Sequence, residues 1–203
     1  GGVFIWNEIN DIETDKLNRK LLIISENYVN VELAKKISYI LIAIASLYFL
    51  VIDIYLLGIA ALLVLFGGYF YNFRPFEWKN KPVLGILTNS ITGILLFAFG
   101  WKFGGAVEKV TFLYSLPYVL VWTSIAILAN IPDKKGDEAV NKITFPIKFG
   151  NKVSVILAAV FVLIAFLLGM KLNDPVITHA ILLASPLYII TVFKPHLDWV
   201  LRT

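Results

Sequence analysis

The chain carries Asn7-Glu8-Ile9-Asn10-Asp11-Ile12-Glu13-Thr14-Asp15 where a short apolar run meets a basic segment. In a helix, Asn7, Asp11 and Asp15 recur every four residues, so their side chains line one face. Two carboxylates at this spacing weaken a helix by about 0.2–0.5 kcal/mol when nothing lies between them. A divalent cation such as Mg²⁺ would turn this repulsion into coordination, because it accepts carboxylate and amide oxygens. We call these three residues the first acidic motif.

The same spacing returns at Asp133 and Asp137, which we call the second acidic motif. Each motif alone has a structural explanation. Pro132 and Asp133 suit the first turn of a helix, where an acidic residue interacts favourably with the helix dipole. The first motif alone resembles a solvated helix end. Because each motif adjoins an apolar segment, the two together favour a shared functional site.

The composition is that of a membrane protein, with 59% apolar and 16% charged residues. Six apolar stretches contain no Asp, Glu, Lys or Arg, and their lengths are near the lower limit for a membrane-spanning helix. They are too long and too uniformly apolar for the strands of a β-barrel. The sequence therefore predicts an all-α, multi-span transmembrane helical bundle. The stretches are 37–52, 55–71, 84–101, 110–129, 153–170 and 176–193.

The distribution of basic residues predicts the orientation. Of 18 Lys and Arg residues, 15 lie on one set of alternate loops, which the positive-inside rule assigns to the cytoplasm. Four stretches separate Asp15 from Asp133, so both acidic motifs are expected on this cytoplasmic face. Basic residues beside apolar spans fit membrane lipids or phosphorylated substrates, and we predict no nucleic-acid partner. Cysteine is absent, which excludes thiolate ligands.

Three segments resemble one known family, the UbiA superfamily of intramembrane prenyltransferases. The first and second acidic motifs look like the two aspartate-rich motifs of that family. The segment from Tyr71 to Lys79 is similar to the tyrosine-proline-lysine segment between them. The chain also departs from the pattern, because residues 20–23 (Lys-Leu-Leu-Ile) replace the usual Arg-Pro-Leu-x-x-Gly. Glu77 stands where a basic residue is usual, a charge that Arg74 would supply.

The resemblance implies transfer of a polyprenyl group from its diphosphate to a hydrophobic acceptor, either an aromatic quinone precursor or a lipid or isoprenoid. It implies Mg²⁺ as cofactor and assigns catalytic and metal-binding roles to Asp11, Asp15, Asp133 and Asp137. Asn7 would bind the metal and the diphosphate. Lys79, Lys142 and Arg74 would bind phosphate oxygens. Tyr71 would stabilise an allylic cation. Asn89 is a polar residue within an apolar stretch, so it marks either a substrate cavity or a hydrogen bond between helices.

Relatives in this family usually have nine spans. The resemblance therefore implies that residues 1–203 are a single transmembrane prenyltransferase domain truncated at both ends. The first span, most of the second and the last would be absent.

A multi-span transporter of a small molecule or ion is the main alternative. Transporters usually place ionisable or unwound polar sites near the bilayer midplane. Here the six stretches carry no charge and the acidic residues gather at one face, which favours an enzyme. A non-catalytic membrane scaffold is a second alternative.

Overall fold

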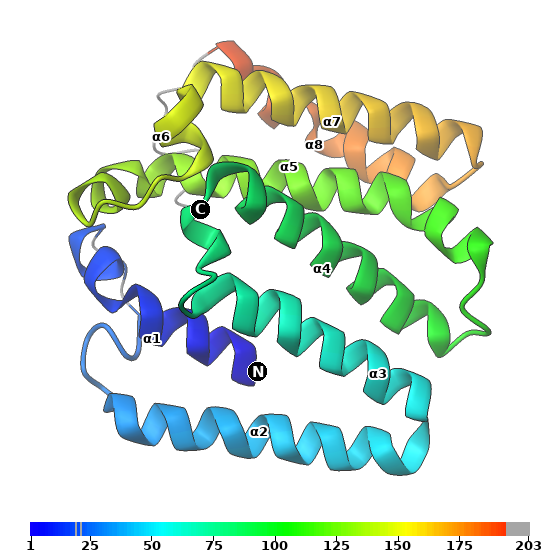
Figure 1. Cartoon of the computed structure of the whole chain (residues 1–203). Helices are drawn as coiled ribbons and strands as arrows, with labels where there is room; N and C mark the ends of the chain where they lie inside the picture. The colour runs from blue at the N-terminus through cyan, green and yellow to red at the C-terminus, as the bar shows by residue number, and fades with distance from the viewer. Residues whose placement is uncertain (19, 21, 194–203) are drawn as a thin grey trace.

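The computed structural model describes residues 1–18, 20 and 22–193, and within these residues it contains helices and no strand (Figure 1). The prediction of an all-α protein is confirmed. The elements are α1 (Gly2–Leu17), α2 (Val31–Ile52), α3 (Ile54–Leu63), the π-helix η1 (Val64–Phe70), the 3₁₀-helix η2 (Trp78–Asn80), α4 (Pro82–Lys102), α5 (Lys109–Ala139), α6 (Phe145–Phe149), α7 (Asn151–Lys171) and α8 (Pro175–Phe193).

Each of the six apolar stretches forms a helix. Among the described residues, α2, α4, α5 and α7 are long and apolar enough to cross a membrane. The other two stretches form shorter apolar helices, over Ile54–Phe70 and Pro175–Ile190. The run Ile54–Phe70 combines α3 with η1, which continues it without a break.

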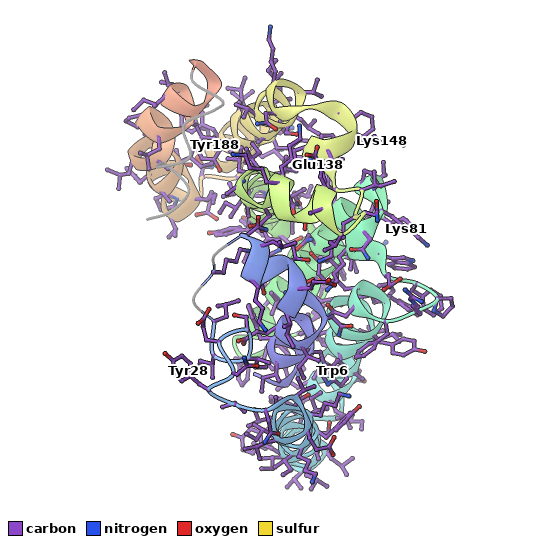
Figure 2. The ribbon with its side chains drawn as sticks, turned by 90° about the vertical axis from the view of Figure 1, so that its left-hand side faces the viewer. Trp6, Tyr28, Lys81, Glu138, Lys148 and Tyr188 are labelled. Carbon is purple, nitrogen blue, oxygen red and sulfur yellow. The ribbon has the colours of Figure 1, made fainter. Side chains whose placement is uncertain are left out.

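The helices pack in the order of the chain. Consecutive long helices are in contact: α2 with α3, α3 with α4, α4 with α5, α5 with α7, and α7 with α8. Helix α1 packs against α2, η1 and α5. Buried residues such as Ile127 of α5 and Ala158 of α7 form the core between these two helices. The C-terminal ends of α1 and α5 lie at the left of Figure 1, with the segment that joins η1 to α4. Figure 2 views the bundle from this end, where Lys81, Glu138 and Lys148 lie.

The contact between α1 and η1 depends on a glycine. A Cβ atom at Gly68 would lie 2.9 Å from the Trp6 ring, so only glycine allows this approach without displacing the ring. The π-helix also places the next polar side chain, since the amide nitrogen of buried Asn72 donates to the Gly68 carbonyl at 3.0 Å. Single π-helical turns occur frequently at functional sites.

The C-terminal end of α5 is held against α1 by Asn18. Its amide nitrogen donates to the Asp133 carbonyl at 3.2 Å, and the Gly136 N–H donates to its Oδ1 atom at 3.0 Å. A Cβ atom at Gly136 would lie 2.5 Å from the Asn18 side chain, so the glycine permits this contact.

The structure corrects the expectation that Pro132 and Asp133 begin a helix. Both lie inside α5, which continues to Ala139. The second acidic motif therefore occupies the last turns of a helix, where the dipole disfavours negative charge. Cations close to Asp133 and Asp137 are needed to offset this unfavourable placement.

Candidate active site

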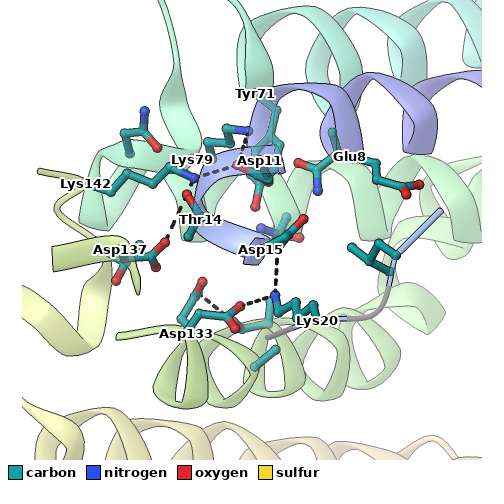
Figure 3. A pocket seen from close by; sticks show the side chains of 18 of the residues that line it. Glu8, Asp11, Thr14, Asp15, Lys20, Tyr71, Lys79, Asp133, Asp137 and Lys142 are labelled. Atoms are coloured by element: carbon teal, nitrogen blue, oxygen red, sulfur yellow. Dashed lines mark hydrogen bonds and ion pairs between the residues drawn. The ribbon is translucent and has the colours of Figure 1, made fainter. Parts of the chain in front are cut away.

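A cavity of about 370 Å³ opens at the end of the bundle where α1, α5 and the segment after η1 meet. Both acidic motifs contribute to its lining, although they are more than 100 residues apart in the sequence. Nine of the ten predicted site residues line it (Figure 3): Asn7, Asp11, Asp15, Tyr71, Lys79, Asn89, Asp133, Asp137 and Lys142.

Arg74 is the predicted residue that the structure leaves outside the cavity. Its side chain is 89% exposed, and its Nε atom lies 3.5 Å from Glu77 Oε2. Arg74 thus pairs with the acidic residue three positions later. The suggestion that Arg74 supplies the charge missing at Glu77 has no support in this geometry.

Two buried lysines meet on Asp11. Lys79 and Lys142 donate to the same Oδ1 atom, at 2.7 and 2.6 Å, and their side chains are only 8% and 14% exposed. Lys79 also donates to Asn72 Oδ1 at 3.1 Å. Burial alone would raise the pKa of the Asp11 carboxyl, but the two ammonium groups hold it below its ordinary value. Asp11 is therefore a carboxylate at neutral pH.

A third lysine joins the two acidic motifs. The Lys20 ammonium lies 2.8 Å from Asp133 Oδ2 and 3.4 Å from Asp15 Oδ1 (Figure 3). Burial lowers the pKa of Lys20, but Asp133 and Asp15 outweigh it and hold the pKa above its ordinary value. The pKa of Asp15 is raised, first by burial and then by the neighbouring carboxylates Asp11 and Asp133, against the opposing effect of Lys20. Lys20 therefore offsets only part of the effect that burial and the neighbouring carboxylates have on the pKa of Asp15.

Three residues that line the cavity each have a buried side-chain oxygen without a hydrogen-bond partner. These oxygens are Asn7 Oδ1, Asn80 Oδ1 and Thr144 Oγ1. Buried polar atoms are normally paired, so these oxygens mark a part of the cavity wall whose hydrogen bonding is incomplete.

The donor set fits a hard cation such as Mg²⁺, because the four aspartates and Asn7 line one cavity and supply the carboxylate and amide oxygens that this ion accepts. In the described part of the chain, however, no three His, Cys, Asp or Glu side chains are close enough to form a complete metal cage. Mg²⁺ usually keeps several waters and binds through one or two carboxylates plus substrate phosphates. The arrangement therefore suits a cation that arrives with a phosphorylated substrate.

Several lining or supporting residues were not predicted from the sequence: Asn18, Lys20, Asn72, Asn80 and Thr144. The sequence did point to Lys20, because this residue begins the stretch 20–23 that departs from the family pattern just after the first acidic motif. Asn18 contacts residues more than 100 positions away, whereas Asn72 contacts the nearby residues Gly68 and Lys79.

Residues 1–197 match the model of the UbiA prenyltransferase family. The chain belongs to this family. With its four long apolar helices, this UbiA family member is an integral, multi-pass membrane protein. The resemblance noted from the two acidic motifs is confirmed.

Individual relatives agree with this assignment. The chain is 32% identical to the digeranylgeranylglyceryl phosphate synthase of Methanocaldococcus jannaschii over 165 residues, which cover 81% of this chain and 56% of that protein. The chain thus spans little more than half the length of this curated relative.

Two solved structures share the fold. A structure of a digeranylgeranylglyceryl phosphate synthase in membranes superposes with a TM-score of 0.63 at 26% identity, covering 96% of this chain and 71% of that chain. A UbiA homologue from Archaeoglobus fulgidus, solved with DMAPP and Mg²⁺ bound, gives a TM-score of 0.74 at 18% identity, covering 95% and 69%. The second similarity supports the fold alone.

Proposed function

We propose that this UbiA family protein transfers a polyprenyl group from its diphosphate to a hydrophobic acceptor, with Mg²⁺ as cofactor. One observation carries the proposal: both acidic motifs and three lysines line a single cavity at the end of a transmembrane bundle. Carboxylates alone would repel a diphosphate, and lysines alone would not bind a divalent cation. Their combination suits a diphosphate together with its metal.

In this proposal, Asp11, Asp15, Asp133 and Asp137 would hold Mg²⁺ together with the substrate phosphates, and Asn7 would add an amide oxygen. The bound metal would neutralise the diphosphate and so make it a better leaving group. Lys79 and Lys142 would turn from Asp11 to the outer phosphate oxygens as charge-assisted donors.

The apolar side of the cavity would receive the prenyl chain. The Tyr71 ring lines the cavity, and an aromatic face stabilises an allylic cation without attacking it. Asn89 donates its amide nitrogen to the Gly85 carbonyl at 2.9 Å, which orients its side chain beside the cavity. Exclusion of water by the surrounding helices would protect the cation from hydrolysis.

For the acceptor, we propose a prenylated glyceryl phosphate. The names of the digeranylgeranylglyceryl phosphate synthases among the relatives support this choice. An aromatic quinone precursor is the second class to test. We also propose that the cavity faces the cytoplasm, because basic residues between the long helices, such as Lys81 and Lys148, lie at this end (Figure 2).

The proposal is tested with the chain reconstituted in lipid. Geranylgeranyl diphosphate, Mg²⁺ and each acceptor are incubated together, and the products are identified by mass spectrometry. We expect a prenylated glyceryl phosphate product that is lost with EDTA and restored by Mg²⁺. Mg²⁺-independent transfer, or no transfer to any acceptor alongside ion-coupled uptake into vesicles, would contradict the proposal and favour a transporter.

A further inference from the structure

Lys20 differs from the other two lysines of the cavity. Lys79 and Lys142 are largely buried and both contact Asp11, and Lys142 also lies 4.0 Å from Asp137 of the second motif. The Lys20 side chain is 40% exposed, and its ammonium lies between Asp15 of the first motif and Asp133 of the second. Lys20 is thus the cavity lysine that contacts the carboxylates of both motifs and also reaches solvent.

We propose that Lys20 is a tethered cation that holds the two acidic motifs together before metal binds and is displaced when the metal arrives. The inference rests on the proposed function, because it takes Asp15 and Asp133 to be metal ligands. Lys20 would make metal binding weak in the absence of substrate. It would couple metal loading to the diphosphate, whose oxygens can accept the released ammonium group.

The competition follows from charge and position. An ammonium 2.8 Å from Asp133 Oδ2 occupies the space that a metal bound to that oxygen would need. Asp15 is buried, and Asp133 lies on the last turns of α5, where the helix dipole disfavours its charge. Removing the ammonium therefore leaves the negative charge of both carboxylates uncompensated, which raises their affinity for a metal ion.

The backbone around Lys20 is held independently of its side chain. The Lys20 N–H donates to the Asp15 carbonyl at 2.9 Å, and the Ser25 hydroxyl donates to the Lys20 carbonyl at 3.3 Å. The Ile24 N–H donates to Glu8 Oε1 at 2.9 Å, which fastens the following segment to α1. Neutralising the side chain should therefore leave this segment in place.

The test measures Mn²⁺ binding to the lipid-reconstituted chain by electron paramagnetic resonance, without diphosphate. We expect Lys20→Gln to bind Mn²⁺ about tenfold more tightly than the unmodified chain. Lys16→Gln is the matched control. Lys16 is exposed in the last turn of α1, and this substitution removes the same charge four residues away without touching a carboxylate. Its Mn²⁺ affinity should stay within about twofold of the unmodified chain.

Thermal unfolding in EDTA gives a second readout. Lys20→Gln should lower the melting temperature of the metal-free protein, and Mn²⁺ should raise it by more than in the unmodified chain. Lys20→Arg keeps the charge, so it should keep the metal-free stability and bind Mn²⁺ no more tightly than the unmodified chain.

Equal or weaker Mn²⁺ binding by Lys20→Gln would overturn the inference while leaving the proposed function intact. An equal gain in Lys16→Gln would also overturn it, since the effect would then be one of general charge. Absence of saturable Mn²⁺ binding in every variant, with and without a prenyl diphosphate, would instead reject the metal site of the proposed function, and the role of Lys20 with it.

Discussion

Replacement of Asp15 by Asn is expected to reduce prenyl transfer by about 1,000-fold or more, which corresponds to about 4 kcal/mol of lost transition-state stabilisation. Asn has almost the same shape but no charge, so it would bind the metal poorly and leave the diphosphate uncompensated. Asp15 is buried and lines the cavity, so its charge acts directly on what the cavity binds. Product formation by the reconstituted variant, quantified by mass spectrometry, checks this prediction.

Glu13→Gln is the matched control for this variant. Glu13 lies on the same helix and carries the same charge, but it is exposed and does not line the cavity. Its transfer rate should stay within about twofold of the unmodified chain. Asp15→Asn should insert into the membrane normally; near-normal activity of this variant would remove Asp15 from the proposed site.

Lys79→Met is expected to raise the KM for the prenyl diphosphate and to lower kcat/KM by roughly 30-fold, equivalent to about 2 kcal/mol. The substitution keeps an unbranched side chain but removes the ammonium that contacts Asp11 and Asn72. A lost charge-assisted hydrogen bond to a phosphate oxygen accounts for an effect of this size. Steady-state kinetics with varied prenyl diphosphate and saturating acceptor measure it.

Lys81→Met removes the same charge two residues later, where the side chain is exposed and outside the cavity. We expect this control to change kcat/KM by less than twofold. If both lysine variants lose activity equally, Lys79 acts through the general positive potential of this end of the bundle and not through a specific contact with phosphate.

Much of the fold could be predicted because a membrane span requires an unbroken apolar segment. The stretch 110–129 predicted the transmembrane part of α5 correctly, but the helix continues to Ala139. Its last ten residues are mostly polar and include Pro132, so hydropathy alone ends the helix too early. The contacts of Asn18 with Asp133 and Gly136 stabilise this extension, and they join residues more than 100 positions apart.

The positions of the acidic residues were predictable, because the spacing of residues within one helix determines which side chains share a face. Carboxylates four residues apart must share a face, and the even number of intervening spans placed both motifs at one end. Lysine contacts were not predictable in this way, because Lys20 and Lys142 each reach a carboxylate from a distant segment. Arg74 was assigned from its place near Glu77 in the family-like segment, but its exposed side chain pairs with Glu77 outside the cavity.

The central claim is that carboxylates of both acidic motifs hold one metal-bound diphosphate. Crystals of the chain grown with Mn²⁺ and a non-reactive prenyl diphosphate analogue test it most directly, through the anomalous signal of the metal. We expect Mn²⁺ in the cavity, about 2.0–2.3 Å from oxygens of at least one aspartate of each motif and from the diphosphate. Mn²⁺ bound to only one motif, or a diphosphate bound outside this cavity, would contradict the claim.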